Sequence, residues 1–400
     1  MPVWEFFQGI YTFFIMTPEI AFARLFLIAL GLVFLYYGYK QVLEPLLMVP
    51  MGIGMIAVNG GLMVFEAGNI GTLFVQPLTN NIEELMYYLQ VDFLQPIYTF
   101  TFSNGLIACL VFMGIGAIIE IDYFMARPFM SMFLAVCAEL GTVFTLPIAM
   151  AWGLVPREAA AIALVGGADG PMVLFGSIVM AKNLFVPIAI VAYLYLSVCY
   201  AGYPILAKII PARLRGIEMD YRDVPKVSRG AKFTFTIAAC GILCLLFPVA
   251  APLFASFFLG LAVKEAGITH YVEFLSGPVL YGSTFFLGFV LGALLGADTI
   301  LDPVVLKLLV LGMVALILSG LGGLAGGMIY YKFSKKPFNP LLGIAAVSCV
   351  PTTAKVAQKC AFKVNKKCMI LPFAMGPNVA GVITTAIITG IYVTGIKYVG

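Results

Sequence analysis

A carboxylate surrounded by apolar sequence gives the strongest chemical signal in this 400-residue chain. Asp169 lies in the stretch Gly-Gly-Ala-Asp-Gly-Pro at 166–171, which apolar residues flank on both sides. Glycine relaxes the backbone and proline interrupts the hydrogen bonds of a helix, so the pattern predicts a half-helix, an irregular tip at Asp169 and a second half-helix. An ionisable side chain at membrane depth indicates a functional site. The alternative is that Asp169 only caps the half-helix that begins near Pro171.

Later breaks in the apolar sequence carry oxygen-bearing side chains that suit this carboxylate. One break reads Asn-Pro-Leu-Leu-Gly-Ile-Ala-Ala-Val-Ser-Cys-Val-Pro at 339–351, and another reads Gly-Pro-Asn-Val-Ala-Gly at 376–381. A hard monovalent cation is bound by carboxylate, amide and hydroxyl oxygens together with carbonyl groups freed at helix ends. The sequence therefore predicts a cation site with four candidate side-chain ligands: Asp169, Asn339, Ser348 and Asn378.

Two further polar side chains lie near these breaks. Lys355 follows the second stretch, where its positive charge can pair with Asp169, bind an anion or donate a proton. Tyr195 lies in the apolar segment after Asp169, where its ring can pack or its hydroxyl can approach the carboxylate. We treat both as candidate catalytic residues with these alternatives open.

The composition is that of a polytopic helical membrane protein. The chain is 62% hydrophobic and only 10% charged, whereas soluble domains carry about 25% charged residues. A net charge of +4 gives no reason to expect nucleic acid as a partner. The single histidine, His270, is expected at the surface, which argues against histidine-based catalysis. The eight cysteines are scattered through apolar segments and are expected to be small buried side chains rather than metal ligands.

Hydropathy predicts a series of spans around polar connectors. Residues 1–20, with Trp4 and several phenylalanines, predict an interfacial helix, and 59–95, with Glu66, predict a polar connector with one short helix. The loop 207–232 is rich in lysine and arginine, so we expect it in the cytoplasm, where it is either solvated or docks an acidic partner. The expected apolar segments are 22–39, 46–58, 97–119, 128–150, 184–206, 231–250, 252–262, 278–297, 303–331 and 368–395.

The layout of the chain indicates a duplication. Broken elements are expected at 156–181 and at 338–363, each followed by a connector with lysine and a span with proline near its start. Two broken helices at matching positions indicate a binding site at the midplane of a transporter. The predicted division is an N-terminal scaffold at 1–96, a first repeat half at 97–206, a connecting region at 207–284 and a second half at 285–400.

These motifs resemble the β subunit of the sodium-translocating, biotin-dependent decarboxylases, which act on oxaloacetate, glutaconyl-CoA, methylmalonyl-CoA or malonate. The resemblance rests on 166–171, 339–351 and 376–381 in that order and extends from about residue 20. It implies an all-α, inverted-repeat, elevator-type fold with two re-entrant helices and a trimeric core in a bacterial or archaeal cytoplasmic membrane. The implied partners are a carboxyltransferase α subunit, a biotin carrier protein and a small single-span γ- or δ-type subunit, with lipid around the complex.

The resemblance also implies roles for individual residues. Carboxybiotin, carried on a partner, would lose CO2 with uptake of a proton while Na+ is exported. Asp169 would be the central Na+ ligand and Tyr195 its polar neighbour. Asn339, Gly343, Ser348 and Asn378 would shape the path of the cation, and Gly343, Ser348 and Lys355 would meet carboxybiotin. Lys355 stands where the family often has arginine, and Met172 stands where a small hydroxyl residue is expected. The alternatives are a stand-alone Na+-coupled carboxylate transporter and a structural scaffold.

Overall fold

The computed structural model describes residues 6–65, 70–76, 81–220, 222 and 226–395, without the side chains of 196–198. The regular secondary structure of these residues is helical apart from one short antiparallel pair of strands. Among them, seven helices are long and apolar enough to cross a membrane, or up to nine if each of two bent helix pairs is one span. The prediction of an all-α polytopic membrane protein is confirmed.

The chain forms two compact units, each assembled from segments that are distant in sequence. Unit 1 comprises Met1–Ile107 and Gly282–Leu309. Its elements are α1 (Gln8–Ile15), α2 (Pro18–Tyr39), α3 (Pro45–Gly60), β1 (Met63–Val64), β2 (Ile70–Gly71), α4 (Ile82–Val91), α5 (Gln95–Ile97), most of α17 (Leu280–Leu294) and α18 (Ala297–Leu301). These units group residues by packing and do not test the predicted division into repeat halves.

Unit 2 comprises Ala108–Tyr281 and Val310–Gly400 and contains the candidate site. Three helices pass from one unit to the other: α6 (Leu106–Ile118), α17 and α19 (Pro303–Phe333). The remaining helices are α7 (Asp122–Ala126), α8 (Pro128–Ala138), α9 (Leu140–Ala151), α10 (Pro156–Ala163), α11 (Gly170–Met180), α12 (Phe185–Leu206), α13 (Ala212–Arg215), α14 (Arg229–Leu246), α15 (Ala251–Glu265), α16 (Thr269–Phe274), α20 (Leu342–Ala345), α21 (Thr352–Val364) and α22 (Leu371–Gly395).

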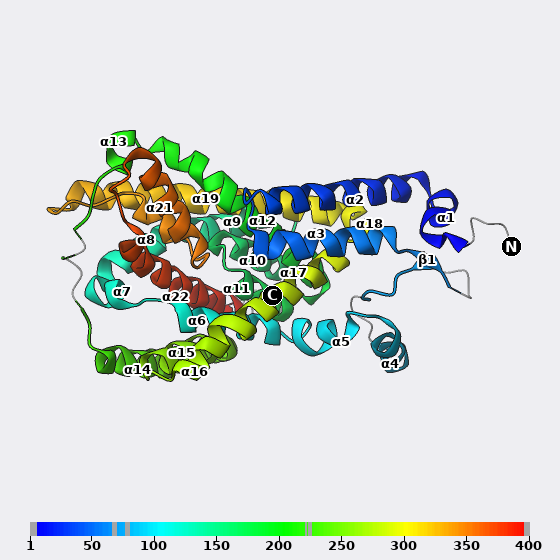
Figure 1. The fold of residues 1–400 in the computed structure, drawn as a ribbon, viewed down its shortest axis with the longest axis horizontal. Coiled ribbons are helices and arrows are strands. Elements are labelled where there is room, and N and C mark those ends of the chain that lie inside the picture. Colours follow the sequence, from blue (N-terminus) through cyan, green and yellow to red (C-terminus); the bar gives the residue numbers. More distant parts are fainter. Residues whose placement is uncertain (1–5, 66–69, 77–80, 221, 223–225, 396–400) are drawn as a thin grey trace. The chain divides into compact units, whose positions relative to one another are not determined.

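In unit 1, α2 and α3 run side by side (Figure 1) because small residues let their backbones approach. A β-carbon added to Gly52 would stand 2.8 Å from the carbonyl oxygen of Gly31. The buried guanidinium of Arg24 fastens α1 to this pair, since it donates to Thr12 Oγ1 at 3.0 Å and to the carbonyl of Asn59 at 2.9 Å. The buried charge of Arg24 is thus satisfied by hydrogen bonds.

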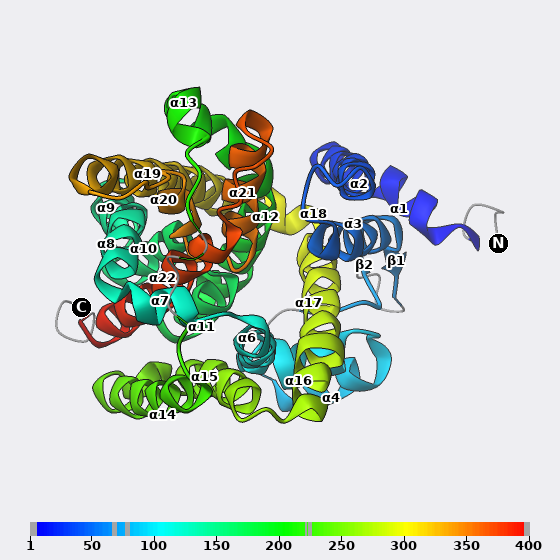
Figure 2. The same ribbon diagram turned by 60° about the vertical axis from the view of Figure 1, so that its left-hand side comes forward.

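In unit 2, helices pack around the two broken elements. Figure 2 shows α22 beside α8 and α10 beside α9, and Figure 1 shows α14 beside α15. We call 156–181 the first break and 338–363 the second break. Each is interrupted as predicted: α10 and α11 are separated by residues 164–169, the first tip, and α20 and α21 by residues 346–351, the second tip.

The structure differs from the sequence prediction in three places. The break predicted at 376–381 does not occur, because α22 continues through Pro377 as a single helix. The connector 59–95 holds the pair of strands β1 and β2 as well as the expected short helix. The segment predicted to begin at 278 begins at Thr269, so His270, although exposed, lies in a helix. A wider π-turn at Leu275–Val279 accommodates Pro278, which cannot donate a backbone hydrogen bond, and the helix therefore continues. Trp4 and Glu66 lie outside the described residues.

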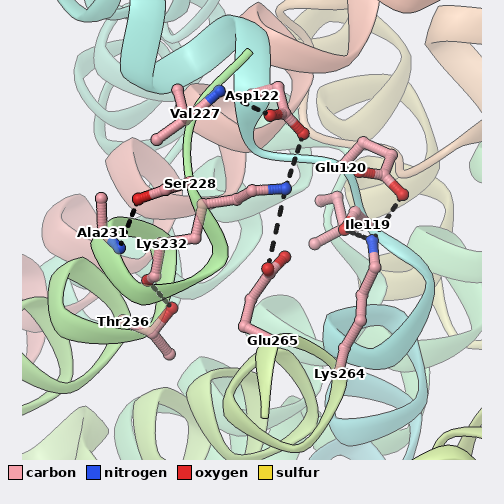
Figure 3. A network of polar contacts seen from close by, with 10 residues as sticks. All are labelled: Ile119, Glu120, Asp122, Val227, Ser228, Ala231, Lys232, Thr236, Lys264 and Glu265. Carbon is pink, nitrogen blue, oxygen red and sulfur yellow. Dashed lines mark hydrogen bonds and ion pairs between the residues drawn. The ribbon is translucent and has the colours of Figure 1, made fainter. Parts of the chain in front are cut away.

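An ion-pair network joins α7, α14 and α15 (Figure 3). Lys232 Nζ lies 2.9 Å from Asp122 Oδ2 and 3.6 Å from Glu265 Oε2. Burial raises the pKa of the Asp122 carboxyl, but the hydrogen bond and charge of Lys232 outweigh this effect and hold that pKa below its usual value. The pair therefore stabilises the fold at neutral pH, and this contribution is lost as the pH falls through the lowered pKa.

We expect Lys232→Met to destabilise the protein strongly, by about 3–5 kcal/mol, because it leaves Glu265, whose side chain is 3% exposed, as an uncompensated buried charge. Lys264→Met is the matched control. Lys264 pairs with Glu120, whose side chain is 58% exposed, and such surface pairs contribute about 0–1 kcal/mol. Thermal unfolding of both variants in the same detergent checks this, and equal losses would contradict it.

Candidate cation site

The first tip places Asp169 at the start of α11. The chain leaves α10 through a 3₁₀ turn at Leu164–Gly167, and Ala168 adopts the left-handed conformation with φ of 56°. Asp169 is 4% exposed, and its Oδ1 accepts a hydrogen bond from the backbone N–H of Met172 at 3.1 Å. Asp169 is thus the N-cap of α11, as the alternative interpretation predicted. This contact occupies one carboxylate oxygen and leaves the charge free to hold a cation as well.

The second tip lies directly against the first. Ser348 donates two hydrogen bonds to the carbonyl of Gly167, from its backbone N–H at 3.1 Å and from Oγ at 2.7 Å. The third motif closes on this contact, because a β-carbon at Gly381 would stand 2.2 Å from the carbonyl oxygen of Ala346. Three motifs that are far apart in sequence therefore meet at one place.

Asn378 supplies an oxygen with no partner in the described structure. Its side-chain nitrogen donates to the carbonyls of Ala345 at 2.8 Å and Val347 at 3.2 Å, and to Thr353 Oγ1 at 3.0 Å. Since all three partners act as acceptors, the amide nitrogen must face them and the oxygen is directed away. Asn378 Oδ1 is buried and accepts no hydrogen bond from any described residue. A buried oxygen of this kind is costly unless a ligand uses it.

A second carboxylate, Glu139, lies beside the tips. It is 3% exposed, and its oxygens accept hydrogen bonds from the hydroxyls of Thr142, at 2.5 Å, and Thr385. The Thr385 hydroxyl lies 2.9 Å from Ser348 Oγ. Glu139 is also an electrostatic neighbour of Asp169. We call the linked contacts Glu139–Thr385–Ser348–Gly167 the hydroxyl chain. Both of its ends are acceptors, so its two hydroxyl protons can satisfy only two of its three links at one time.

Glu139 is not among the site residues predicted from the sequence. Its only signal there is an acidic side chain in the middle of an apolar span, and a buried carboxylate at such a position needs polar partners. Thr385, which supplies one of them, lies 246 residues away. The residue could thus be noticed, but its place in the site could not be assigned.

Tyr193 is an aromatic neighbour of the first tip that the sequence prediction did not include. A β-carbon at Gly170 would stand 2.7 Å from Tyr193 Oη, so the absence of a side chain at Gly170 makes room for this ring. Tyr193 Oη is buried without a hydrogen-bond partner among the described residues, and Asp169 acts on it electrostatically. The ring of Tyr195 instead packs against Gly312 of α19.

Comparison with known proteins identifies the family. Residues 23–396 match the family described as Na+-transporting oxaloacetate decarboxylase beta subunit. The chain belongs to this family. It is therefore the membrane β subunit of a Na+-pumping decarboxylase, and the resemblance inferred from the three motifs is confirmed.

Similar proteins include members that are named for different substrates. A carboxybiotin decarboxylase of Malonomonas rubra is 54% identical over 97% of both chains. A methylmalonyl-CoA decarboxylase subunit beta of Propionigenium modestum is 34% identical over 90% of this chain and 91% of its own length. A probable oxaloacetate decarboxylase beta chain of Vibrio cholerae is 30% identical over 93% of this chain and 94% of its own length. Names such as subunit and chain place this family of multi-pass membrane proteins in multi-subunit complexes.

In this β subunit, Asn339 lies where the chain enters the second break. Both the nitrogen and the oxygen of its side-chain amide form hydrogen bonds there. Its nitrogen donates to the carbonyls of Arg215 at 2.9 Å and Ile217 at 3.0 Å. Its oxygen accepts from the N–H of Leu341 at 3.0 Å. Asn339 thus ties the second break to the basic loop and has no carbonyl oxygen left without a partner.

Gly343 and Lys355 of the β subunit are also placed away from direct contact with Asp169. A β-carbon at Gly343 would stand 1.8 Å from the carbonyl oxygen of Gly323, so this glycine lets α20 pack directly on the backbone of α19. Lys355 is exposed in the first turn of α21. It forms no salt bridge with Asp169, although both residues are described.

The two breaks are closed by contacts at opposite ends of α12. The ends of the first break meet where Asn183 donates to Glu158 Oε1 at 2.9 Å, just before α12 begins. The end of the second break is fastened to the loop after α12, where the Asn365 amide donates to Glu218 Oε1 at 2.7 Å and to the carbonyl of Gly216 at 3.2 Å. The contacts that close the two breaks therefore lie before and after α12, which is bent: the segments Lys182–Tyr195 and Cys199–Ile209 meet at an angle of 53°.

Proposed function

We propose that this chain decarboxylates carboxybiotin delivered by a partner biotin carrier and couples the reaction to export of Na+ at the meeting point of the two tips. The observation that carries the proposal is the contact of Ser348 with Gly167, which brings a hydroxyl of the second tip to the tip that holds the buried Asp169. The unpartnered amide oxygen of Asn378 lies on a residue that contacts the second break. Membership of the Na+-transporting family and the relative named carboxybiotin decarboxylase support it.

The cation ligands that we propose are Asp169, Ser348 and the oxygen of Asn378, completed by carbonyl groups of the tips. This set contains hard oxygen donors, which suit Na+. We place Asn339 outside it, because both polar atoms of that amide hold the entrance of the second break. Its proposed role is to fix the second break to the basic loop.

Two carboxylates in one buried site supply the proposed coupling. Asp169 and Glu139 are both almost fully buried, so two negative charges there are costly unless a cation or a proton compensates them. When Na+ leaves, a proton can take its place, and when Na+ returns, the proton is released. Proton uptake and Na+ binding are thereby linked, as the pump requires.

In the reaction, the bond between a ureido nitrogen of biotin and the carboxyl carbon breaks. CO2 leaves, the electron pair of the bond stays on the nitrogen, and the nitrogen takes up one proton. Lys355 is the exposed charge nearest in sequence to the second tip, so we propose that it receives the carboxylate of the substrate. The buried Asp169 holds the cation and does not contact the biotin ring.

We further propose that 97–206 and 285–400 are inverted repeats that work as an elevator in a trimer. The closure of the two breaks at opposite ends of α12 supports two hairpins that enter the membrane from opposite sides. The proposed partners are a carboxyltransferase α subunit, a biotin carrier protein and a small single-span subunit, in the cytoplasmic membrane of a bacterium or archaeon.

Purification tests the function against a stand-alone secondary transporter. We expect the tagged chain to co-purify with a biotinylated protein that avidin detects. Inverted vesicles containing the complex should accumulate ²²Na+ when the carboxylated substrate of the partner is added. Na+-driven carboxylate uptake by the chain alone, without a biotinylated partner, would instead establish the secondary transporter.

For Lys355 we expect a severe loss of decarboxylation in Lys355→Met and a milder loss in Lys355→Arg. A bound carboxylate needs a positive charge, which arginine keeps and methionine removes. The rate with saturating biotin carrier checks this. Lys359→Met, which changes another exposed lysine one turn further along α21, is the matched control. Near-normal rates in both Lys355 variants would remove this residue from the mechanism.

A further inference from the structure

A cavity of about 340 Å³ lies in unit 2, away from the tips. Its walls come from the start of α8, the end of α19 with the connector that follows, the loop at 219–220 and the start of α22. Sites that hold small organic molecules have volumes of about 300–1,000 Å³. The cavity is therefore large enough for a ligand, and neither the cation nor its proposed side-chain ligands account for it.

The cavity is positively charged. Arg127, Lys335 and Lys336 line it with three cationic side chains, against one carboxylate, that of Asp220. This carboxylate is already paired, because Arg222 Nη2 lies 3.1 Å from Asp220 Oδ2. The remaining positive charge favours an anionic ligand.

The cavity also lies at the boundary of the membrane. Candidate spans begin at Pro128 and end at Phe333, and the loop at 219–220 belongs to the basic segment expected in the cytoplasm. Large exposed apolar side chains accompany the charges: Phe333, which lines the cavity, is 82% exposed, and Phe129, two residues after Arg127, is 91% exposed. A soluble anion would use the cations and leave these rings in water.

The inner wall is aromatic. The rings of Tyr330 and Phe338 lie 4.7 Å apart, and those of Tyr123 and Phe373 lie 5.3 Å apart. Aromatic side chains with polar tips are typical of the level of lipid headgroups. Charge, aromatic walls and exposed apolar rims thus occur together at the end of two spans.

We infer that this cavity binds the headgroup of an anionic phospholipid, with its phosphate between Arg127 and the two lysines and its acyl chains along Phe129 and Phe333. Basic pockets between membrane helices on the cytoplasmic side are a known way of binding such headgroups. The ligand would contact Phe373, five residues before Asn378 in α22, and Phe338, the residue before Asn339. The lipid would therefore contact both the start of the second break and α22, the helix that carries Asn378.

Quenching by brominated lipids tests this without any assay of decarboxylation. The full chain carries Trp4→Phe, Trp152→Phe and Phe333→Trp, so the single tryptophan reports on the cavity rim. Vesicles contain brominated phosphatidylglycerol or brominated phosphatidylcholine in equal amount. We expect phosphatidylglycerol to be bound at least about tenfold more strongly, since one basic residue near an anionic surface accounts for about fivefold.

Two triple variants, each made in this reporter background, separate the cavity from the general surface charge. Arg127→Gln, Lys335→Gln and Lys336→Gln together should bring the preference to within about twofold of unity. Lys208→Gln, Arg213→Gln and Lys226→Gln remove the same charge from exposed positions outside the cavity lining and should leave it unchanged. If the first triple variant does not fold, Arg127→Gln alone should lose about fivefold and Arg127→Lys should not.

Three results would overturn the inference. The first is equal quenching by the two lipids in the reporter protein, and the second is an equal loss of preference in the two triple variants. The third is displacement of the brominated lipid by soluble glycerol 3-phosphate at a similar concentration, which would assign the cavity to a free phosphate compound.

Discussion

In Asp169→Asn, we expect Na+-dependent decarboxylation to fall by at least about two to three orders of magnitude while the complex still assembles. Removing one partner of a buried ion pair costs about 3–5 kcal/mol, because the other charge is left without compensation. We expect a loss of this size in the binding of the cation. Asparagine keeps an oxygen for the Met172 N–H, and it caps helices as well as aspartate does. The rate as a function of Na+ concentration, with size-exclusion chromatography of the complex, measures both effects.

Two further variants separate the charge of Asp169 from its cap. Asp169→Ala removes both and should lower stability by about 0.5–2 kcal/mol relative to Asp169→Asn. Ser177→Ala removes another buried oxygen from α11, one that only donates within the helix to Leu174 at 2.9 Å, and should stay within about twofold of normal activity. Activity of Asp169→Asn close to normal at ordinary Na+ would exclude this carboxylate as the coupling group.

The breaks could be predicted because their signals are local. Gly166, Gly167 and Pro171 weaken a membrane helix, and the structure interrupts it at 164–169, although α22 continues through Gly376 and Pro377. The same holds for the segment around Pro351. That the two tips meet could be expected from the duplication, but the bond from Ser348 to Gly167 joins residues 181 positions apart and needs the structure.

The partners of single side chains could not be predicted. Tyr193 and Tyr195 are two positions apart, so they point about 200° apart on one helix, and nothing local says which of them faces Asp169. Asn339 looked like a cation ligand because it is an amide in a break, yet its partners lie in a loop more than 120 residues earlier. The roles of these side chains are decided by contacts with residues that are distant in sequence, and the residue type alone does not reveal them.

Glu139 is the positioning residue with the largest expected effect. In Glu139→Gln we expect the Na+ concentration for half-maximal rate to rise about tenfold or more, with a smaller fall in the maximal rate. The Thr385 hydroxyl has a single proton, and while it donates that proton to the Glu139 carboxylate, its link to Ser348 needs the Ser348 proton, which then leaves the Gly167 carbonyl. The amide of glutamine can donate a hydrogen bond to Thr385, which a carboxylate cannot do. Thr385 is then able to donate its proton to Ser348, so the direction of the hydroxyl chain reverses. The substitution also removes a negative charge near the cation.

A double-mutant cycle distinguishes this role from simple packing. Glu139→Gln combined with Ser348→Ala should show a coupling energy of about 1 kcal/mol or more in apparent Na+ affinity, because both changes act on one hydrogen-bond chain. Glu139→Gln combined with Asn183→Ala, which breaks the surface contact with Glu158, should be additive within about 0.5 kcal/mol. If both pairs are additive, Glu139 supports the helices around the tips but does not set the cation ligands. If only Glu139→Gln and Ser348→Ala are coupled, then the Glu139 carboxylate determines which acceptor the Ser348 hydroxyl donates to. Glu139 can do this without contacting the ion.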